Sequence, residues 1–267
     1  MRKYTTTNGK IIIKPFNKIW IVLAVLVILL VIFSQFIYSY QITLSEIGVI
    51  LKKMFSPDTN DTWGDYFSYI FNLKDPLVLT LQMSFAGSLI GSVLAVPIAF
   101  MASSNIIKSK WIYVPVRTIL NLIRTVPAMV LVLIGVYFVG TGVLSGIIGL
   151  SLFSFGIMAK MLFEAIETVD MSPYEALEST GANKIQAFKY AVVPQIMPTY
   201  VSYLIYIFEL NIRASAILGF VGVEGIGKSI SDNIPANYDH VGAAVILLFI
   251  LILIIQMIST HLRGRLQ

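Results

Sequence analysis

The sequence has 267 residues, of which 57% are hydrophobic and only 12% charged, with a formal net charge of +5 and no cysteine. Soluble proteins carry about 25% charged residues, so this composition excludes a soluble globular protein and predicts a membrane protein. The lack of cysteine excludes disulfides, zinc–cysteine sites and iron–sulfur clusters. The positive charge does not indicate nucleic-acid binding here, because its distribution along the chain matters more than its sum.

Six stretches are long and apolar enough to cross a bilayer as helices, which requires about 20 mostly apolar residues. We therefore expect an all-α membrane protein with about six transmembrane helices. The first stretch is too long for the apolar core of a signal peptide and has no small-residue cleavage site after it, so we interpret it as an anchor. The six stretches cover residues 19–37, 77–102, 111–140, 143–163, 196–221 and 241–260.

The distribution of lysine and arginine predicts the orientation, because basic residues concentrate in cytoplasmic segments. Five basic residues precede the first stretch, and alternation from there places fourteen of the nineteen basic residues inside. Both termini are then cytoplasmic. The expected division begins with a basic cytoplasmic tail (1–18), a first transmembrane helix (19–38) and an extracytoplasmic loop (39–76). A core with five transmembrane helices (77–262) and a cytoplasmic tail (263–267) follow. The core includes a cytoplasmic loop (164–195) and an extracytoplasmic glycine-rich loop (221–240).

The segment from Gly222 to Ser229, GVEGIGKS, matches the pattern G-x-x-x-x-G-K-[ST] of a nucleotide-binding P-loop. A P-loop needs a buried strand before it and a helix after it within an α/β sheet, and no such domain is predicted. The expected topology also puts this segment on the outer face, away from cytoplasmic ATP. We interpret Gly222, Gly225 and Gly227 as residues of a tight turn. A minor alternative is that the backbone amides of this turn contact an anion.

The loop 164–195 contains the start and stop signals of two short helices. Ser172, Pro173 and Glu175 predict a capped first helix, and Gly181 suits its left-handed end. Asn183 with Gln186 predicts the start of a second helix, which we expect to end before Pro194. Its apolar face would consist of Ile185, Phe188 and Val192.

The spacing within this loop resembles the EAA loop of ABC importer permeases, which reads EAA, three residues, Gly, nine residues and I-x-L-P. Glu175, Ala176, Gly181 and Pro194 match, whereas Leu177 departs conservatively. The resemblance implies that the loop sits in a cleft of a cytoplasmic ATP-binding subunit and transmits its closure to the membrane helices. The implied coupling residues are Ser172, Pro173, Glu175, Ala176, Gly181, Ala182, Ile185, Phe188 and Pro194.

Most of residues 77–266 also resembles the permease subunit of phosphonate and phosphite-like ABC importers. The most distinctive segment is ELNIRAS, from Glu209 to Ser215; Val223 and Glu224 depart from the usual glycine-rich segment. The resemblance implies a MetI-like permease fold in a bacterial cell membrane. It also implies two permeases (identical or paralogous), two ATP-binding subunits and one external substrate-binding protein. ATP and Mg²⁺ would bind the partner subunit, so this chain would be no enzyme and hold no cofactor.

Ionisable residues within the fifth stretch are expensive in a bilayer and indicate a partner or a cavity. At about 100° per residue, Ser202, Tyr206, Glu209 and Arg213 share one face of a helix, while Asn211 points away. Glu209 precedes Arg213 by four residues, the favourable order for an ion pair. Either the pair only fixes helix packing, or the stripe lines the translocation path, where Arg213 would attract an anion.

Arg117 and Arg124 share one face of the helix that enters the third stretch. They either reach toward lipid headgroups or contact the inner mouth of the path, and Arg124 is a further path candidate. The spacings Gly87/Gly91 and Gly142/Gly146 predict close helix approach. No metal-ligand spacing and no nucleophile–base arrangement occurs.

The function that these features favour is the permease subunit of an ATP-driven importer for phosphonate or a related oxyanion such as phosphite or phosphate. One alternative is a secondary transporter or channel that uses Glu209 and Arg213 as an ion site. Another is an ABC permease for a different small solute.

Overall fold

The computed structural model describes residues 3–5, 11–13, 19–39, 44–58, 62–234 and 236–266. The chain separates into two units, residues 1–52 and 53–267. In the first unit, β1 (Lys3–Thr5) and β2 (Ile11–Ile13) form an antiparallel pair, followed by α1 (Ile19–Ser39) and the start of α2 (Leu44–Met54). The hairpin lies in the predicted tail and was not expected, although three consecutive isoleucines have high strand propensity.

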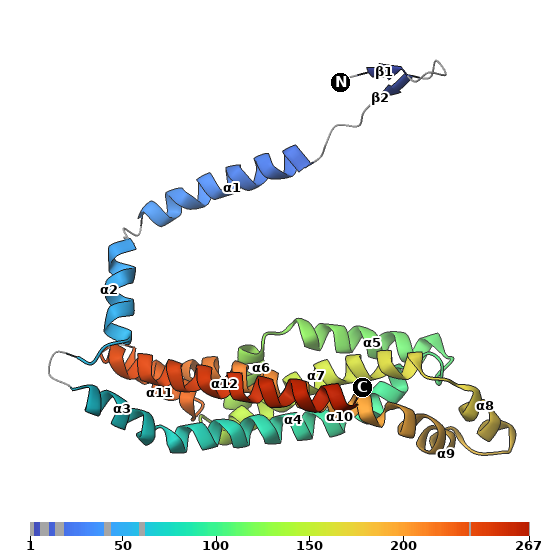
Figure 1. The fold of residues 1–267 in the computed structure, drawn as a ribbon. Coiled ribbons are helices and arrows are strands. Elements are labelled where there is room, and N and C mark those ends of the chain that lie inside the picture. Colours follow the sequence, from blue (N-terminus) through green and yellow to red (C-terminus); the bar gives the residue numbers. More distant parts are fainter. Residues whose placement is uncertain are drawn as a thin grey trace. The chain divides into compact units, whose positions relative to one another are not determined.

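The second unit is a bundle of helices in which α10 packs against α4, α7 and α12, and α4 packs against α7 (Figure 1). The helices of the loop between α7 and α10 lie at one end of this unit, and α3 and α11 lie at the other. The elements are α3 (Trp63–Asn72), α4 (Lys74–Ala102), α5 (Lys110–Thr125), α6 (Ala128–Val139), α7 (Val143–Thr168), α8 (Ser172–Ser179), α9 (Lys184–Ala187), a π-helical turn η1 (Phe188–Val192), α10 (Val193–Leu218), a 3₁₀ turn η2 (Gly219–Val221), α11 (Ile226–Asn233) and α12 (Tyr238–Leu266).

Within the described residues, four helical stretches are long and apolar enough to cross a membrane: Trp63–Ala102, Val143–Thr168, Lys184–Val221 and Tyr238–Arg265. The helix pair α5 and α6 makes a fifth when it is counted as one span, and α1 contains a shorter apolar helix, Ile21–Ser34. The all-helical membrane architecture of the bundle is confirmed. The count of six and the sides of the termini stay predictions.

The third predicted span is not one straight helix, because α5 and α6 meet at an angle of 92°. The bend falls at Val126 and Pro127, and Val126 has the extended backbone that a following proline favours. Proline also lacks the N–H group that would continue the helical hydrogen bonds. Arg117 and Arg124 therefore lie on a helix distinct from the apolar α6.

The close approach of α4 and α7 confirms the role expected for Gly87 and Gly91. A Cβ atom on Gly87 would lie 2.6 Å from the Cβ of Leu150, and one on Gly91 would lie 2.6 Å from the Cβ of Ser154. Both glycines thus let the α4 backbone rest directly on α7. Gly142 instead precedes α7 with a φ of 132°.

Replacing Gly91 with alanine is expected to destabilise the protein by about 1–3 kcal/mol, because the added methyl group overpacks the α4–α7 contact. The midpoint of thermal unfolding of the purified protein in detergent measures this effect. Gly48→Ala in α2 is the control, since a Cβ there meets nothing within 4 Å and alanine favours a helix. Equal midpoints for the two variants would contradict the packing argument.

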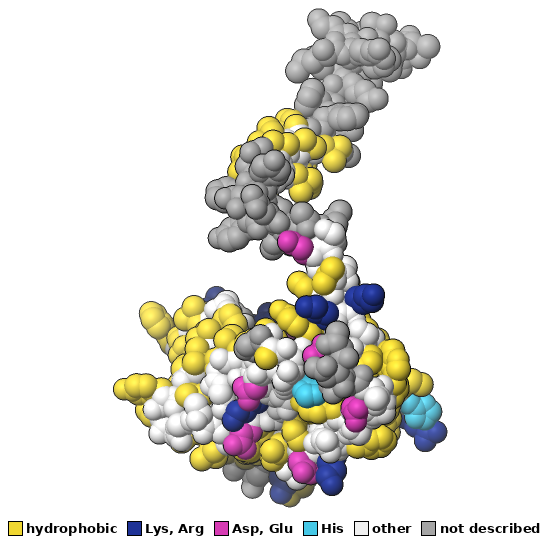
Figure 2. Space-filling model, turned by 90° about the vertical axis from the view of Figure 1, so that its left-hand side faces the viewer, with side chains coloured by type: hydrophobic (Ala, Val, Ile, Leu, Met, Phe, Trp, Pro, Cys, Tyr) yellow, Lys and Arg dark blue, Asp and Glu magenta, His cyan; other side chains and the backbone are white. Residues whose placement is uncertain are grey.

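The surface of the second unit suits a bilayer. Figure 2 looks onto its α3 and α11 end, where acidic, basic and polar side chains gather in the middle of the face and hydrophobic side chains border it. Large apolar side chains are exposed along the helices, among them Leu94 on α4, Phe138 on α6 and Phe249 on α12. Such an apolar belt is stable in lipid and not in water.

Candidate functional site

The loop between α7 and α10 begins with a cap that differs from the predicted one. The carboxylate of Asp170 accepts hydrogen bonds from the backbone N–H of Ser172 (2.9 Å) and from its hydroxyl (2.7 Å). These bonds lower the pKa of Asp170, the backbone bond most strongly. Ser172 is the first residue of α8, so the predicted capping box between Ser172 and Glu175 is wrong, whereas Pro173 occupies the first turn as predicted.

The turn and the second helix start follow the prediction. Gly181 has a φ of 94°, which favours glycine. Asn183 and Gln186 form a reciprocal capping box at the start of α9. The helix does not end before Pro194, however, because the π-helical turn η1 joins α9 to α10, and Pro194 is the second residue of α10.

This continuity makes the stretch Lys184–Val221 one helical rod from the loop through the bundle. The loop helix α9 and the bundle helix α10 are therefore parts of the same helical stretch.

The predicted coupling residues differ in exposure: most are exposed, and Phe188 is buried. Phe188 is buried and packs edge-to-face on Phe100 at 4.9 Å, which anchors the loop to α4. Ile185 does not share this buried face, since it is 72% exposed. The exposed set is Ser172, Pro173, Glu175, Ala176, Gly181, Ile185 and Pro194, and Ala182 is half-buried.

The base of the loop is fastened by contacts that the sequence did not indicate. The Gln195 side chain accepts from the Asp170 backbone N–H (3.2 Å) and donates to its carbonyl (3.0 Å), joining the start of the loop to α10. Tyr174 is 3% exposed. Burial, reinforced by the nearby Glu178 carboxylate, raises the pKa of Tyr174 to about 12. Its phenol stays neutral at physiological pH and keeps α8 docked on the bundle.

Arg117 lies in a group of polar contacts where α4, α5 and α7 meet beside this loop, which we call the junction, and not on a lipid-facing surface. It forms an ion pair with Glu167 at the end of α7 and donates from Nε to the carbonyl of Ala102 (2.8 Å). Its guanidinium also lies 4.6 Å from the ring centre of Phe163. Glu167 further accepts from the backbone N–H and the hydroxyl of Ser104. The junction ties α4, α5 and α7 together beside the loop, so the lipid-headgroup interpretation of Arg117 is wrong.

Replacing Glu167 with glutamine is expected to cost about 1.5–3 kcal/mol of stability, because it removes the charge that Arg117 and the Ser104 donors share. Thermal unfolding in detergent measures the loss. Glu164→Gln on the same helix is the matched control: that carboxylate is 55% exposed and 3.4 Å from Lys160, a surface pair worth about 0–1 kcal/mol. Indistinguishable midpoints would show that the junction contributes nothing.

The predicted pair on the fifth span exists and is part of a larger cluster. Glu209 is 5% exposed and forms an ion pair with Arg213 of its own helix. From α12, the Ser259 hydroxyl donates to Glu209 (2.9 Å), and Arg263 Nη2 lies 3.5 Å from the same carboxylate oxygen. Arg213 also donates to Gln256 (3.2 Å). The cluster therefore joins α10 to α12, and Arg263, expected in a cytoplasmic tail, lies within α12.

Asn211 points to the opposite side of α10, as predicted. It is fully buried, and its amide nitrogen donates to the hydroxyls of Ser88 on α4 and Ser154 on α7, each at 2.8 Å. Three central helices thus meet at one amide, which fixes the rotation of α10.

A cavity of about 520 Å³ lies next to the Glu209 cluster. Two path candidates, Ser202 and Tyr206, line it together with Tyr203, Thr260 and Arg263. Glu209 and Arg213 are neighbours of this cavity and not lining residues. Arg124 is not brought to it: its side chain is exposed and runs along α7 beside Gly156.

The glycine-rich segment forms a turn and a short helix at the other end of the bundle. Gly222 and Gly225 have positive φ values of 81° and 121°, and α11 starts directly afterwards. Gly227 lies against the backbone carbonyl oxygens of Ser215 and Ala216 in α10. Helices and a 3₁₀ turn flank this segment, so the strand that a P-loop requires is absent between residues 62 and 234.

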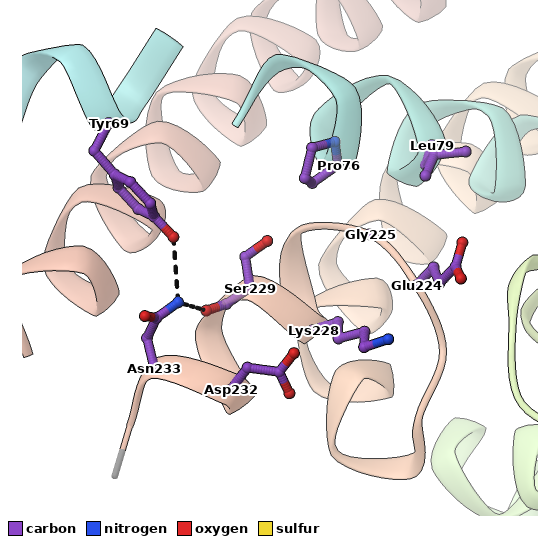
Figure 3. A pocket seen from close by; sticks show the side chains of 9 residues that line it. All are labelled: Tyr69, Pro76, Leu79, Glu224, Gly225, Lys228, Ser229, Asp232 and Asn233. Atoms are coloured by element: carbon purple, nitrogen blue, oxygen red, sulfur yellow. Dashed lines mark hydrogen bonds between the residues drawn. The ribbon is translucent and has the colours of Figure 1, made fainter. Parts of the chain in front are cut away.

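A pocket of about 350 Å³ lies beside this turn (Figure 3). Asn233 donates to the hydroxyl of Tyr69 (3.2 Å) and to the carbonyl of Ser229 (2.7 Å), which ties α11 to α3. Glu224, Lys228 and Asp232 supply both signs of charge to the lining. Among the residues described, no group of three or more histidine or acidic side chains is placed to hold a metal ion.

Comparison with known proteins places this geometry in a family. Residues 87–266 match the family described as the binding-protein-dependent transport system inner membrane component. The chain belongs to this family. It is an integral membrane permease component, and in such ABC transporters the ATPase is a separate subunit, so the permease itself is not an enzyme.

Two relatives illustrate the match. The permease is 36% identical to the phosphite transport system permease protein PtxC of Stutzerimonas stutzeri, over 82% of this chain and 78% of that protein. It is 34% identical to the phosphate-import permease protein PhnE of Mycolicibacterium smegmatis, over 70% of this chain and 35% of that protein.

Solved structures share the permease fold. The MetNI methionine ABC transporter in an inward-facing conformation matches with a TM-score of 0.65 at 22% identity, covering 73% of this chain and 96% of that chain. A bacterial ABC transporter that imports alginate matches with a TM-score of 0.63 at 20% identity, covering 93% of this chain and 99% of that chain. The predicted MetI-like fold is confirmed.

Sequence reasoning missed several residues of the permease that the geometry brings into the site. Ser259, Gln256 and Arg263 join the Glu209 cluster from α12, and Glu167 joins Arg117. A signal existed for Glu167, an acid near the end of an apolar stretch that also needs a partner. Nothing in the sequence indicates which face of α12 meets α10.

Proposed function

We propose that this permease forms the translocation path of an ATP-driven importer for a phosphorus oxyanion of the phosphite, phosphonate or phosphate class. The observation that carries the proposal is the 36% identity with a phosphite transport permease over 82% of the chain. The ELNIRAS segment, which contributes Glu209, Asn211 and Arg213 to the bundle, supports the same class.

In the proposed assembly two permeases, identical or paralogous, associate with two cytoplasmic ATP-binding subunits and one extracytoplasmic binding protein. One exposed α8–α9 loop per chain suits one ATP-binding subunit per permease. ATP and Mg²⁺ bind those subunits, and this chain holds no cofactor of its own. The termini are cytoplasmic, and α11 faces the binding protein.

The mechanism is alternating access. Closure of the ATP-binding subunits moves α8 and α9, and the continuous helical stretch Lys184–Val221 carries this movement into the bundle. Phe188 and the Asp170–Gln195 bonds keep the loop attached while it moves. The path then opens outward to receive the anion, and hydrolysis returns it to the inward-open state.

Reconstitution tests the proposal. The permease is placed in liposomes with its ATP-binding subunit and its binding protein, and uptake of phosphite, methylphosphonate and phosphate is compared with that of glycine betaine and methionine. We expect uptake of at least one phosphorus oxyanion that requires ATP and the binding protein. Uptake by the permease alone would support a secondary transporter instead, and uptake of only betaine or methionine would overturn the substrate class.

A further inference from the structure

The cavity beside the Glu209 cluster has unsatisfied hydrogen-bonding capacity. Four residues that carry a hydroxyl group line it: Ser202, Tyr203, Tyr206 and Thr260. None of the four hydroxyl groups has a hydrogen-bond partner within the described part of the chain. Hydroxyl groups donate readily to the oxygens of an anion.

The charge at this cavity is positive. Two arginines, Arg213 and Arg263, face the single carboxylate of Glu209. Arg213 is in direct contact with that carboxylate, whereas Arg263 stands 3.5 Å away. Two guanidinium groups thus share one carboxylate, so the three side chains have a net charge of +1, and Arg263 is the member of the cluster that lines the cavity.

The remaining contacts of Arg263 are weak ones. Its Nε donates to the carbonyl of Ser259 at a long 3.4 Å, and its guanidinium lies 5.5 Å from the ring centre of Tyr206. Both position the planar group beside the cavity without using all of its five N–H donors. A guanidinium with free donors matches the geometry of phosphate-type oxygens.

We propose that this cavity binds a tetrahedral phosphorus oxyanion, with Arg263 as its cationic partner and the hydroxyls of Ser202, Tyr206 and Thr260 as further donors. The transported anion is one source of this group, and in that case the proposal rests on the proposed function. The phosphodiester of a lipid headgroup is the other source, because it presents similar oxygens. Because Glu209 neutralises one of the two arginines, the net charge of the cluster is only +1. A doubly charged anion is therefore bound weakly enough to dissociate.

The position of the cavity links it to the coupling loop. Its lining residues on α10 lie between Glu209 and the π-helical turn η1, and those on α12 come from the last turns of that helix. Since α10 is continuous with α9, movement of the loop changes the spacing between α10 and α12. The affinity of the site for the anion then differs between the inward-open and the outward-open state.

A binding experiment on the complete permease–ATPase complex in lipid nanodiscs, without binding protein, tests the site. Radiolabelled inorganic phosphate is titrated against the wild type, Arg263→Gln and the matched control Arg265→Gln, an exposed arginine two residues along the same helix. We expect the Arg263→Gln complex to bind phosphate about tenfold or more weakly, as for the loss of one charge-assisted pair. The control should bind like the wild type.

Folding of the variants can be judged independently. Arg263→Gln leaves Glu209 with Arg213 and Ser259, so the buried carboxylate keeps partners. Tyr206→Phe is a second variant that preserves the ring beneath Arg263 and removes only a hydroxyl; we expect it to weaken phosphate binding about threefold. Size-exclusion behaviour and basal ATP hydrolysis report whether each complex is intact.

The two sources of the anion are separated by measuring retained lipid in the same samples by native mass spectrometry. If the ligand is a lipid headgroup, the wild type and Arg265→Gln retain anionic lipid that Arg263→Gln loses. If it is free anion, lipid retention is equal and phosphate binding differs. Equal phosphate binding and equal lipid retention in Arg263→Gln and Arg265→Gln would overturn the site.

Uptake by the wild-type complex separates this proposal from the proposed function. A wild type that imports no phosphorus oxyanion contradicts the proposed function, and the binding and lipid measurements still decide the site. A wild type that imports the anion, with Arg263→Gln matching Arg265→Gln in phosphate binding, lipid retention and uptake, refutes the site alone.

Discussion

Replacing Glu209 with glutamine is expected to destabilise the protein by about 1.5–3 kcal/mol, the usual contribution of hydrogen bonds to a charged group. Glu209 is 5% exposed and neutralises Arg213 directly. Without its charge, Arg213 and Arg263 are two like charges with no counter-ion in the cluster. The midpoint of thermal unfolding of the purified complex in detergent measures the loss, and ATP-dependent uptake should fall with it.

A double-mutant cycle gives the control for this prediction. Glu209→Gln combined with Arg213→Gln removes both members of the pair, so the double variant should be more stable than the sum of the two single effects predicts. The expected coupling is about 1–3 kcal/mol. Additive effects, with no coupling, would mean that the pair contributes only through the size and shape of its side chains.

The same cluster shows how far the sequence can predict the site. The pairing of Glu209 with Arg213 is local, since residues four apart on a helix face the same way. The contributions of Ser259 and Arg263 depend on how α12 is rotated and shifted against α10. That register comes from packing of small and large side chains along both helices, which one sequence does not encode in any short pattern.

The loop between α7 and α10 is likewise predictable only in part. Gly181 and the Asn183–Gln186 cap were predictable because each depends on only a few neighbouring residues. The cap at Ser172 was assigned to the wrong residue, since Asp170 also precedes the helix and its carboxylate is the stronger acceptor. Pro194 predicts that the helix ends before it, but the π-helical turn η1 carries the helix through this position into α10.

The break between α5 and α6 arises from the same ambiguity. An apolar run longer than 20 residues predicts a span by its composition, but the direction of the chain changes by 92° within it. The sequence contained the cause, Pro127, and the polarity change after Arg124. Composition alone could not decide whether the proline kinks one helix or separates two.

Replacing Ile185 with aspartate is expected to weaken association with the ATP-binding subunit strongly without unfolding the permease. Ile185 is 72% exposed, and burying such a side chain in a partner's cleft contributes about 1.5–3 kcal/mol. An aspartate loses that contribution and adds the cost of desolvating a charge. We expect at least about tenfold weaker assembly, measured by co-purification of the ATP-binding subunit at a series of concentrations.

Two further measurements test whether Ile185 belongs to the surface that docks on the ATP-binding subunit. Ile185→Val retains most of the apolar side chain and should assemble within a few-fold of the wild type. Thermal unfolding of the permease alone should be unchanged by Ile185→Asp, because the side chain contacts solvent and not the bundle. If the aspartate variant assembles normally and imports its anion at the wild-type rate, Ile185 does not enter the partner's cleft. The docking surface would then consist of α8, whose exposed residues include Pro173, Glu175 and Ala176.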